Sequence, residues 1–116
     1  MIQINNLTDN AIQSVSVNMP DGSTAAMTLY FRGTIQRWFF DFIHADFPNG
    51  GILGTGLCLH PNLFRNFINT FPFGLSCITA SGQDPVSPED FVNGNGTLYI
   101  LDTQDVQSVE TQFYTP

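Results

Sequence analysis

The sequence predicts an all-β domain: a small antiparallel β-sandwich or a partly open barrel of about six to seven strands, with at most one or two short helical turns. Short segments with alternating apolar and polar residues recur along the chain, and clusters of Gly, Pro, Asn and Asp separate them at hairpin spacing. Apolar residues at helical spacing are scarce. The 116 residues suffice for a single domain with one core, in which residues 1–10 form a short first strand or an extended arm.

The first hairpin is predicted over residues 12–32. In its first strand, residues 12–19, the valines share one face and the serines share the other, as in a sheet with one wet side. Residues 20–23 contain Asp-Gly, a strong turn signal because glycine accepts positive φ. The return strand, residues 23–32, is predicted to place its apolar side chains inward: Ala25, Met27, Leu29 and Phe31.

The second hairpin joins an aromatic strand, residues 35–44, to a return strand, residues 52–60, through a loop at 46–51. With a period of two, one face of the aromatic strand takes Trp38, Phe40, Phe42 and His44, and the other takes Phe39, Asp41 and Ile43. Because both faces carry aromatic rings, we expect the strand to be covered by its own core and by another layer or chain. In the return strand, Leu53, Leu57 and Leu59 are predicted to point inward.

The second half of the chain has weaker signals. Residues 62–68 are predicted to form either a helix of at most two turns or a loop of extended turns. Strands are predicted at 75–80 and 97–101, separated by a polar loop and a helical turn whose Phe91 enters the core. In the last strand, either Leu98 and Ile100 or Tyr99 and Leu101 point inward. Beyond it, Val106 and Val109 are the main apolar anchors.

Charge is sparse and acidic. Charged residues make up 11% of the chain, with no lysine, whereas soluble domains typically carry about a quarter. The shortage indicates either a surface that is covered in use or a surface of neutral polar residues. With a net charge of −7 and three scattered arginines, the chain is not expected to bind nucleic acid or an anionic membrane surface.

Cys58 and Cys77 are predicted to be buried free thiols, with a disulfide as the alternative. Two cysteines and two distant histidines make a poor zinc set, so neither a metal nor a cofactor is expected. A solvated acidic face is favoured over a cation site. The N-terminal residues lack a signal-peptide pattern and no apolar run is long enough to span a membrane, so synthesis in the cytoplasm is expected.

Three interpretations of the polar and aromatic residues stay open. Arg32 and Arg37 are predicted to form a structural ion pair with Asp41. A small hydrolase would use His44 with Asp41, although no catalytic motif accompanies them. A small β-barrel module would hold an apolar ligand among its aromatic rings: Trp38, Phe40 and Phe42.

The chain contains more aromatic residues than one face of a small sheet buries easily. Aromatic residues dominate interface hot spots, so some are expected to contact a partner. The candidate interface residues are Trp38, Phe39, Phe40, Phe47, Phe64, Phe67, Phe71 and Phe73.

Several short motifs follow one another along the chain: Tyr30-x-Arg32, Trp38-x-x-Asp41, Gly56-x-x-Leu59-x-Pro61-Asn62-Leu63, Phe73-Gly74, Pro88-x-Asp90-Phe91 and Leu98-Tyr99-Ile100-Leu101. Their order and spacing resemble the small baseplate plug proteins of contractile-tailed bacteriophages, known from cyanophage baseplates and related prophage tails. The resemblance covers about residues 25–105, and no single motif is specific. Residues 64–73 depart from the family pattern.

The resemblance implies a structural virion protein, a β-domain packed between the hub or spike and the tail tube in several copies. It implies no catalytic residue, and it places the protein in the tail baseplate after synthesis in the host cytoplasm.

Overall fold

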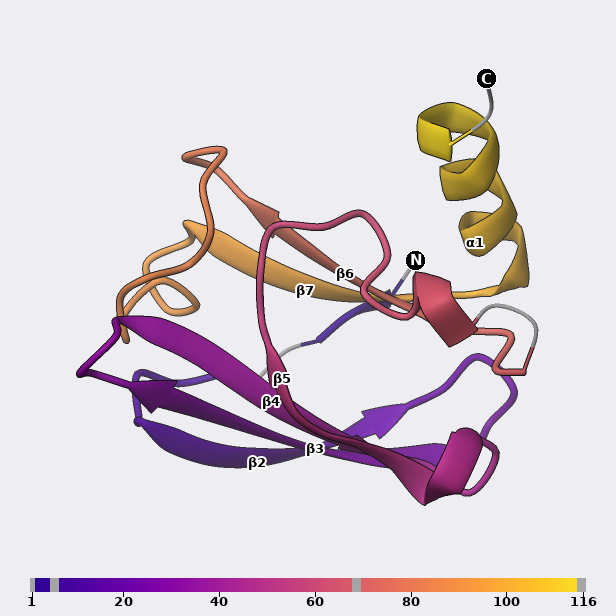
Figure 1. Ribbon diagram of the computed structural model, residues 1–116, viewed down its shortest axis with the longest axis horizontal. Helices are drawn as coiled ribbons and strands as arrows, with labels where there is room; N and C mark the ends of the chain where they lie inside the picture. Colours follow the sequence, from indigo (N-terminus) through magenta and orange to yellow (C-terminus); the bar gives the residue numbers. More distant parts are fainter. Residues whose placement is uncertain (1, 5–6, 68–69, 115–116) are drawn as a thin grey trace.

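The computed structural model describes residues 2–4, 7–67 and 70–114, and shows two antiparallel sheets stacked as an open sandwich (Figure 1). One sheet has the order β2-β3-β4-β5 and the other β1-β7-β6. The all-β prediction is confirmed. The first sheet contains β2 (Ile12–Asn18), β3 (Thr24–Arg32), β4 (Arg37–Ile43) and β5 (Gly51–Gly56), and the second β1 (Ile2–Gln3), β7 (Gly96–Leu101) and β6 (Gly74–Thr79).

The predicted first hairpin is confirmed. Seven residue pairs join β2 to β3 without a register shift, from Ile12 opposite Tyr30 to Asn18 opposite Thr24. The turn between them uses the expected chemistry, since an Asp21 side-chain oxygen accepts the backbone N–H of Ser23 at 2.9 Å and Gly22 has a φ of +88°.

The core lies between the sheets and is rich in phenylalanine. The predicted division of β4 into two faces holds, and the face with Trp38, Phe40 and Phe42 is the inward one, because all three side chains are fully buried. Phe42 packs on a ring from the loop after β5, with the centroids of Phe42 and Phe64 4.8 Å apart. The predicted burial of Phe91 is also confirmed: its ring stands edge-on to Trp38, whose indole N–H donates to a loop carbonyl. The loop between β6 and β7 therefore completes the aromatic core around Trp38.

The predicted return strand at 52–60 was partly wrong, because β5 ends at Gly56. Leu57 is buried as expected, but Leu53 is 70% exposed and Leu59 is 37% exposed. The pairing of β4 with β5 shifts register by a bulge, and Gly54 in β5 has a φ of +64°. A bulge interrupts the alternation of side chains, which explains why a simple period of two failed here.

The segment after β5 folds as a loop with one short 3₁₀ helix, Arg65–Phe67. The Oδ1 atom of Asn62 accepts the backbone N–H of Phe64 at 3.0 Å and that of Leu75 at 3.3 Å, so this side chain ties the loop to β6. A Cβ atom on Gly74 would lie 2.6 Å from the same Oδ1, so the close approach requires glycine. The rest of the predicted segment, residues 68 and 69, lies outside the described residues.

The helix at the end of the chain was not predicted. Helix α1 (Thr103–Val109) begins with a capping box, in which Asp102 and Asp105 each accept the other's backbone N–H, and a π-helical turn continues it. Val106 and Val109 pack with Leu101 in a small second core. Leu101 thus faces α1, whereas Leu98 and Ile100 of the same strand enter the main core.

Candidate interaction surface

Most of the predicted interface aromatics lie inside the sandwich. Of the six buried rings, Trp38 and Phe40 come from β4, and the other four come from loops that fold back over the end of the core (Figure 1). Phe39 and Phe67 are only partly buried. The structure therefore leaves two of the eight candidates with surface to offer a partner. The six buried rings, each at most 8% exposed, are Trp38, Phe40, Phe47, Phe64, Phe71 and Phe73.

The outer face of the four-stranded sheet carries a row of apolar side chains that no element of the described chain covers. Ile12 lies opposite Tyr30, and Tyr30 lies opposite Phe39, so the three residues cross β2, β3 and β4 side by side. The Tyr30 and Phe39 rings stack with centroids 5.9 Å apart, and the guanidinium of Arg32 lies over both rings. Ile12 is 73% exposed. We call these residues, Ile12, Tyr30, Arg32 and Phe39, the outer row.

Hydrogen bonds to Asp41 fix the position of Tyr30 in the outer row. The Asp41 carboxylate accepts the Tyr30 hydroxyl at 3.3 Å and the backbone N–H of Gly54 at 2.7 Å. Desolvation and, second, the negative charge of Asp41 raise the pKa of Tyr30, so the phenol keeps the proton that it donates. Ile43 and Leu53 are exposed and extend the apolar surface beyond Asp41. The face thus combines fixed aromatic rings with accessible aliphatic side chains.

The structure does not form the predicted ion pair of Arg32 and Arg37 with Asp41. Asp41 lies four residues beyond Arg37 in the same strand, a distance of about 13 Å along an extended backbone. Arg37 instead lies 3.9 Å from Asp84, with both side chains about half exposed, at 48% and 46%. Such a pair contributes little to stability. Arg32 and Arg37 are opposite each other in the sheet, but the structure brings neither onto Asp41, whose oxygen serves Tyr30 and Gly54.

His44 follows the last residue of β4 and is buried against the Phe71 ring of the core, whereas Asp41 stands on the outer face of β4. The Nδ1 atom of His44 accepts the backbone N–H of Asp46 at 3.0 Å, so the neutral ring carries its proton on Nε2 and donates it to the Ser23 hydroxyl, 2.8 Å away. Ser23 donates to Asp21 at 2.5 Å, and this bond is the main cause that lowers the pKa of Asp21. In this chain of hydrogen bonds the histidine donates to the serine, and the serine donates to the carboxylate. A serine nucleophile is activated in the opposite way, because there the serine donates its proton to the histidine. The arrangement ties two hairpin ends together.

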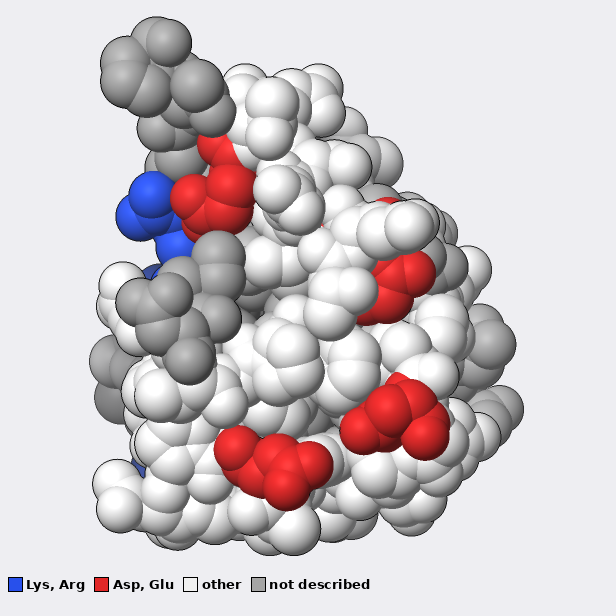
Figure 2. Space-filling view, turned by 90° about the vertical axis from the view of Figure 1, so that its right-hand side faces the viewer, with Lys and Arg blue, Asp and Glu red and all other residues white. Residues whose placement is uncertain are grey.

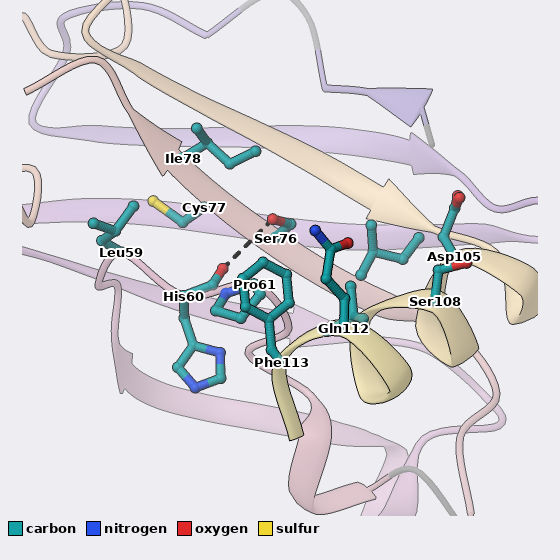
Figure 3. A pocket seen from close by; sticks show the side chains of 12 residues that line it. Leu59, His60, Pro61, Ser76, Cys77, Ile78, Asp105, Ser108, Gln112 and Phe113 are labelled. Carbon is teal, nitrogen blue, oxygen red and sulfur yellow. Dashed lines mark hydrogen bonds between the residues drawn. The ribbon is translucent and has the colours of Figure 1, made fainter. Parts of the chain in front are cut away.

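The apolar ligand hypothesis loses its predicted residues, since Trp38, Phe40 and Phe42 are packed against other rings. A groove of about 460 Å³ lies elsewhere, between β6 and the C-terminal helix (Figure 3). Pro61 and Phe113 both line it, and Ile78 lies further along β6. None of the three expected rings lines this groove.

Both cysteines are free thiols, as predicted, but only Cys77 is buried and Cys58 is partly exposed. Burial raises the pKa of Cys77 to about 12, and burial also raises the pKa of Cys58. Among the described residues, no group of three His, Cys, Asp or Glu side chains is arranged to hold a metal ion. No helix in the described ranges is both long and apolar enough to cross a membrane.

Figure 2 shows the end of the molecule that carries α1, where separate carboxylate groups stand among uncharged atoms and basic atoms appear only along one edge. The chain has ten acidic and three basic residues, so this end offers little positive charge to a phosphate backbone.

Comparison with known proteins gives one result that bears on function. The model of the family described as "Cyanophage baseplate Pam3 plug gp18" matches residues 1–105 of the 116. The match includes both sheets and the whole outer row, and it ends near the start of α1. The curated proteins contain no match to the chain.

Proposed function

The chain belongs to the cyanophage baseplate plug family, and from this premise we propose that it is a structural, non-enzymatic subunit of a contractile phage tail baseplate. In this proposal it packs between the hub or spike proteins and the tail tube, is present in several copies, and resides in the virion. The family match supports a structural role in the baseplate. The position within the baseplate is our proposal.

We infer that the outer row, together with Ile43 and Leu53, is the surface that contacts a neighbouring tail protein. The observation that carries this inference is the fixed Tyr30–Phe39 stack, flanked on one sheet face by Ile12 and Leu53 at 73% and 70% exposure. Apolar side chains gathered on one face lose contact with water when a partner covers them. Aromatic and arginine side chains are also enriched at the centres of interfaces, and Arg32 lies on these rings.

A structural role also agrees with the hydrogen bonds of Ser23 and His44, the residues that most resemble catalytic groups. Ser23 donates to Asp21 and accepts from His44, so its hydroxyl proton is already committed to a carboxylate. His44 is 4% exposed and both of its ring nitrogens have partners within the fold. These contacts favour the use of the histidine in holding hairpins together.

The experiment measures binding of the purified chain to the hub, spike and tube proteins of the same tail. The test variant is Phe39→Glu, which places a charge in the outer row. The matched control is Thr24→Glu, which adds the same charge on the same sheet face at the far end of β3. We expect Phe39→Glu to weaken binding by roughly tenfold or more and Thr24→Glu to bind as the wild type does.

Circular dichroism and thermal unfolding check that each variant is folded, and Ile43→Glu replaces Phe39→Glu if that variant does not fold. Equal binding by the folded variants and the wild type would reject the outer row as the contact surface. Failure of the wild type to bind any of the three tail proteins would reject the proposed position in the baseplate.

A further inference from the structure

Strand β2 has a free edge. It pairs only with β3 among the described residues and stands at the end of the sheet order. Backbone bonds at both ends fix which residues face β3: Phe31 donates to Ala11 at 2.7 Å, and Met19 donates to Ser23 at 2.8 Å. Since bonding alternates along an antiparallel strand, odd-numbered residues of β2 bond to β3. The N–H and C=O groups of Ile12, Ser14, Ser16 and Asn18 therefore point away from the sheet.

In the described part of the chain, β2 lacks the charges, prolines and bulges by which natural sheets prevent edge pairing. The seven residues of β2 include no charge and no proline, and their register with β3 has no shift. The opposite edge strand, β5, has a bulge and a glycine with φ of +64°. An uncharged, regular edge is a template for another strand, whereas a bulged one is not. The four residues with outward backbone groups are also exposed at their side chains.

We propose that β2 is an interface between two copies of this chain, whose β2 strands pair in antiparallel orientation about a two-fold axis at Val15. The outward-facing residues are symmetric about this position. Ile12 meets Asn18 of the second copy, Ser14 meets Ser16, and the reverse pairs follow by symmetry. All four pairs are of the hydrogen-bonded type, in which each pair exchanges two backbone bonds.

The side chains of β2 fit a copy of themselves. Serines oppose serines on the outer face, and Val15 opposes its own copy on the inner face in a non-hydrogen-bonded pair, where Cβ atoms are about 4.5–5.5 Å apart. No charge lies within the paired strands. Asp9 and Asp21, just beyond the two ends, would approach each other across the interface, and each chain carries a net charge of −7. Pairing is therefore expected to strengthen as salt increases.

Two-fold pairing closes the free edge instead of propagating it, because the same surface serves both copies. An axis perpendicular to the sheet leaves the outer rows of both copies on one face of an eight-stranded sheet. The pair thus doubles the surface available to a larger partner. This interface does not depend on the proposed function, since it needs only the chain itself.

The first experiment is disulfide trapping of the full chain in a Cys58→Ser background. Val15→Cys lies at the axis, and Val17→Cys is the matched control on the same strand face, two residues away from it. Under mild oxidation we expect a covalent dimer for Val15→Cys and at least about tenfold less for Val17→Cys, because only an axial pair meets disulfide geometry. Equal trapping of both variants, or none of either, would overturn the pairing.

The second experiment is sedimentation equilibrium of Ser16→Pro and Ser16→Ala. Proline removes an outward N–H but no bond to β3, and each substitution acts twice in a symmetric dimer. We expect Ser16→Pro to weaken dimerisation by roughly tenfold or more and Ser16→Ala to leave it unchanged. A monomeric wild type, or an unaltered Ser16→Pro dimer, contradicts the proposal. If Ser16→Pro fails to fold, the trapping experiment decides.

Discussion

The two faces of β4 contain the same kind of side chain with different environments. On the inner face, Phe42 is fully buried and touches rings from three loop positions, Phe47, Phe64 and Phe71. On the outer face, Phe39 keeps part of its surface in water and stacks on one ring, that of Tyr30. The comparison teaches that aromatic content by itself does not mark an interface. Loops from elsewhere in the chain cover one face, and the other face has no such cover in the described structure.

The largest expected effect separates the two faces by stability. Phe42→Ala removes a ring from the middle of the aromatic core, so we expect a loss of about 3–5 kcal/mol in the free energy of unfolding. Phe39→Ala removes one stacked, partly exposed ring and should cost about 1 kcal/mol. Urea unfolding followed by Trp38 fluorescence measures both. Similar losses for the two variants would show that the outer face is as much a part of the core as the inner one.

The next effect tests how the loop is held over the inner face. Asn62→Ala leaves the buried backbone N–H groups of Phe64 and Leu75 without their acceptor, and should destabilise the fold by about 2 kcal/mol. Asn66→Ala, an exposed substitution in the same loop, is the control and should stay within about 0.5 kcal/mol of the wild type. Equal stability of the Asn62 variant would mean that the rings alone hold the loop.

A smaller effect is expected at α1, away from both faces of β4. Asp102→Ala removes one half of the capping box and should lower the free energy of unfolding by about 1 kcal/mol. Thermal unfolding measures this change, and binding to tail proteins should be unaltered because the outer row lies elsewhere. Loss of binding in this variant would move the interaction surface toward the C-terminal helix.

The smallest effect concerns acid pH. Hydrogen bonds from Ser23 lower the pKa of Asp21 below its usual value of 3.8. A carboxylate with a lowered folded-state pKa stabilises the fold above its unfolded pKa, and this contribution is lost as pH falls through the folded value. Unfolding measured at pH 5 and at pH 3 should therefore show a smaller decrease for Asp21→Asn than for the wild type. Parallel decreases would show that the hydrogen bonds in this turn do not alter its titration.

The sequence predicted the first hairpin and the two faces of β4 because both depend on local chemistry, the Asp-Gly turn and the alternation of Trp38, Phe40 and Phe42. It did not predict which face is buried, and it counted Trp38 and Phe40 among the candidate interface residues. It failed at Leu53, where a bulge changes the phase of β5, and it missed α1. The capping pair Asp102 and Asp105 was the available signal for that helix, but the two buried valines gave only a weak periodicity.

The proposed contact surface was harder to predict than the fold. Phe64 and Phe71 have the composition of contact residues, but their burial depends on how a long loop folds back, which no local pattern specifies. The outer row combines Ile12, Tyr30 and Phe39 from three strands. It becomes visible only once the register between the strands is known.

The central claim is that the outer face of the four-stranded sheet is covered in the baseplate. The direct measurement is the rate of maleimide labelling of Ile43→Cys in a Cys58→Ser background, in the free protein and in the assembled baseplate. Ile43 is 45% exposed in the isolated chain, so the free protein should label readily. The account predicts a rate at least about tenfold lower in the baseplate, because a covered thiol is shielded from the reagent. Equal rates in the two states would contradict it.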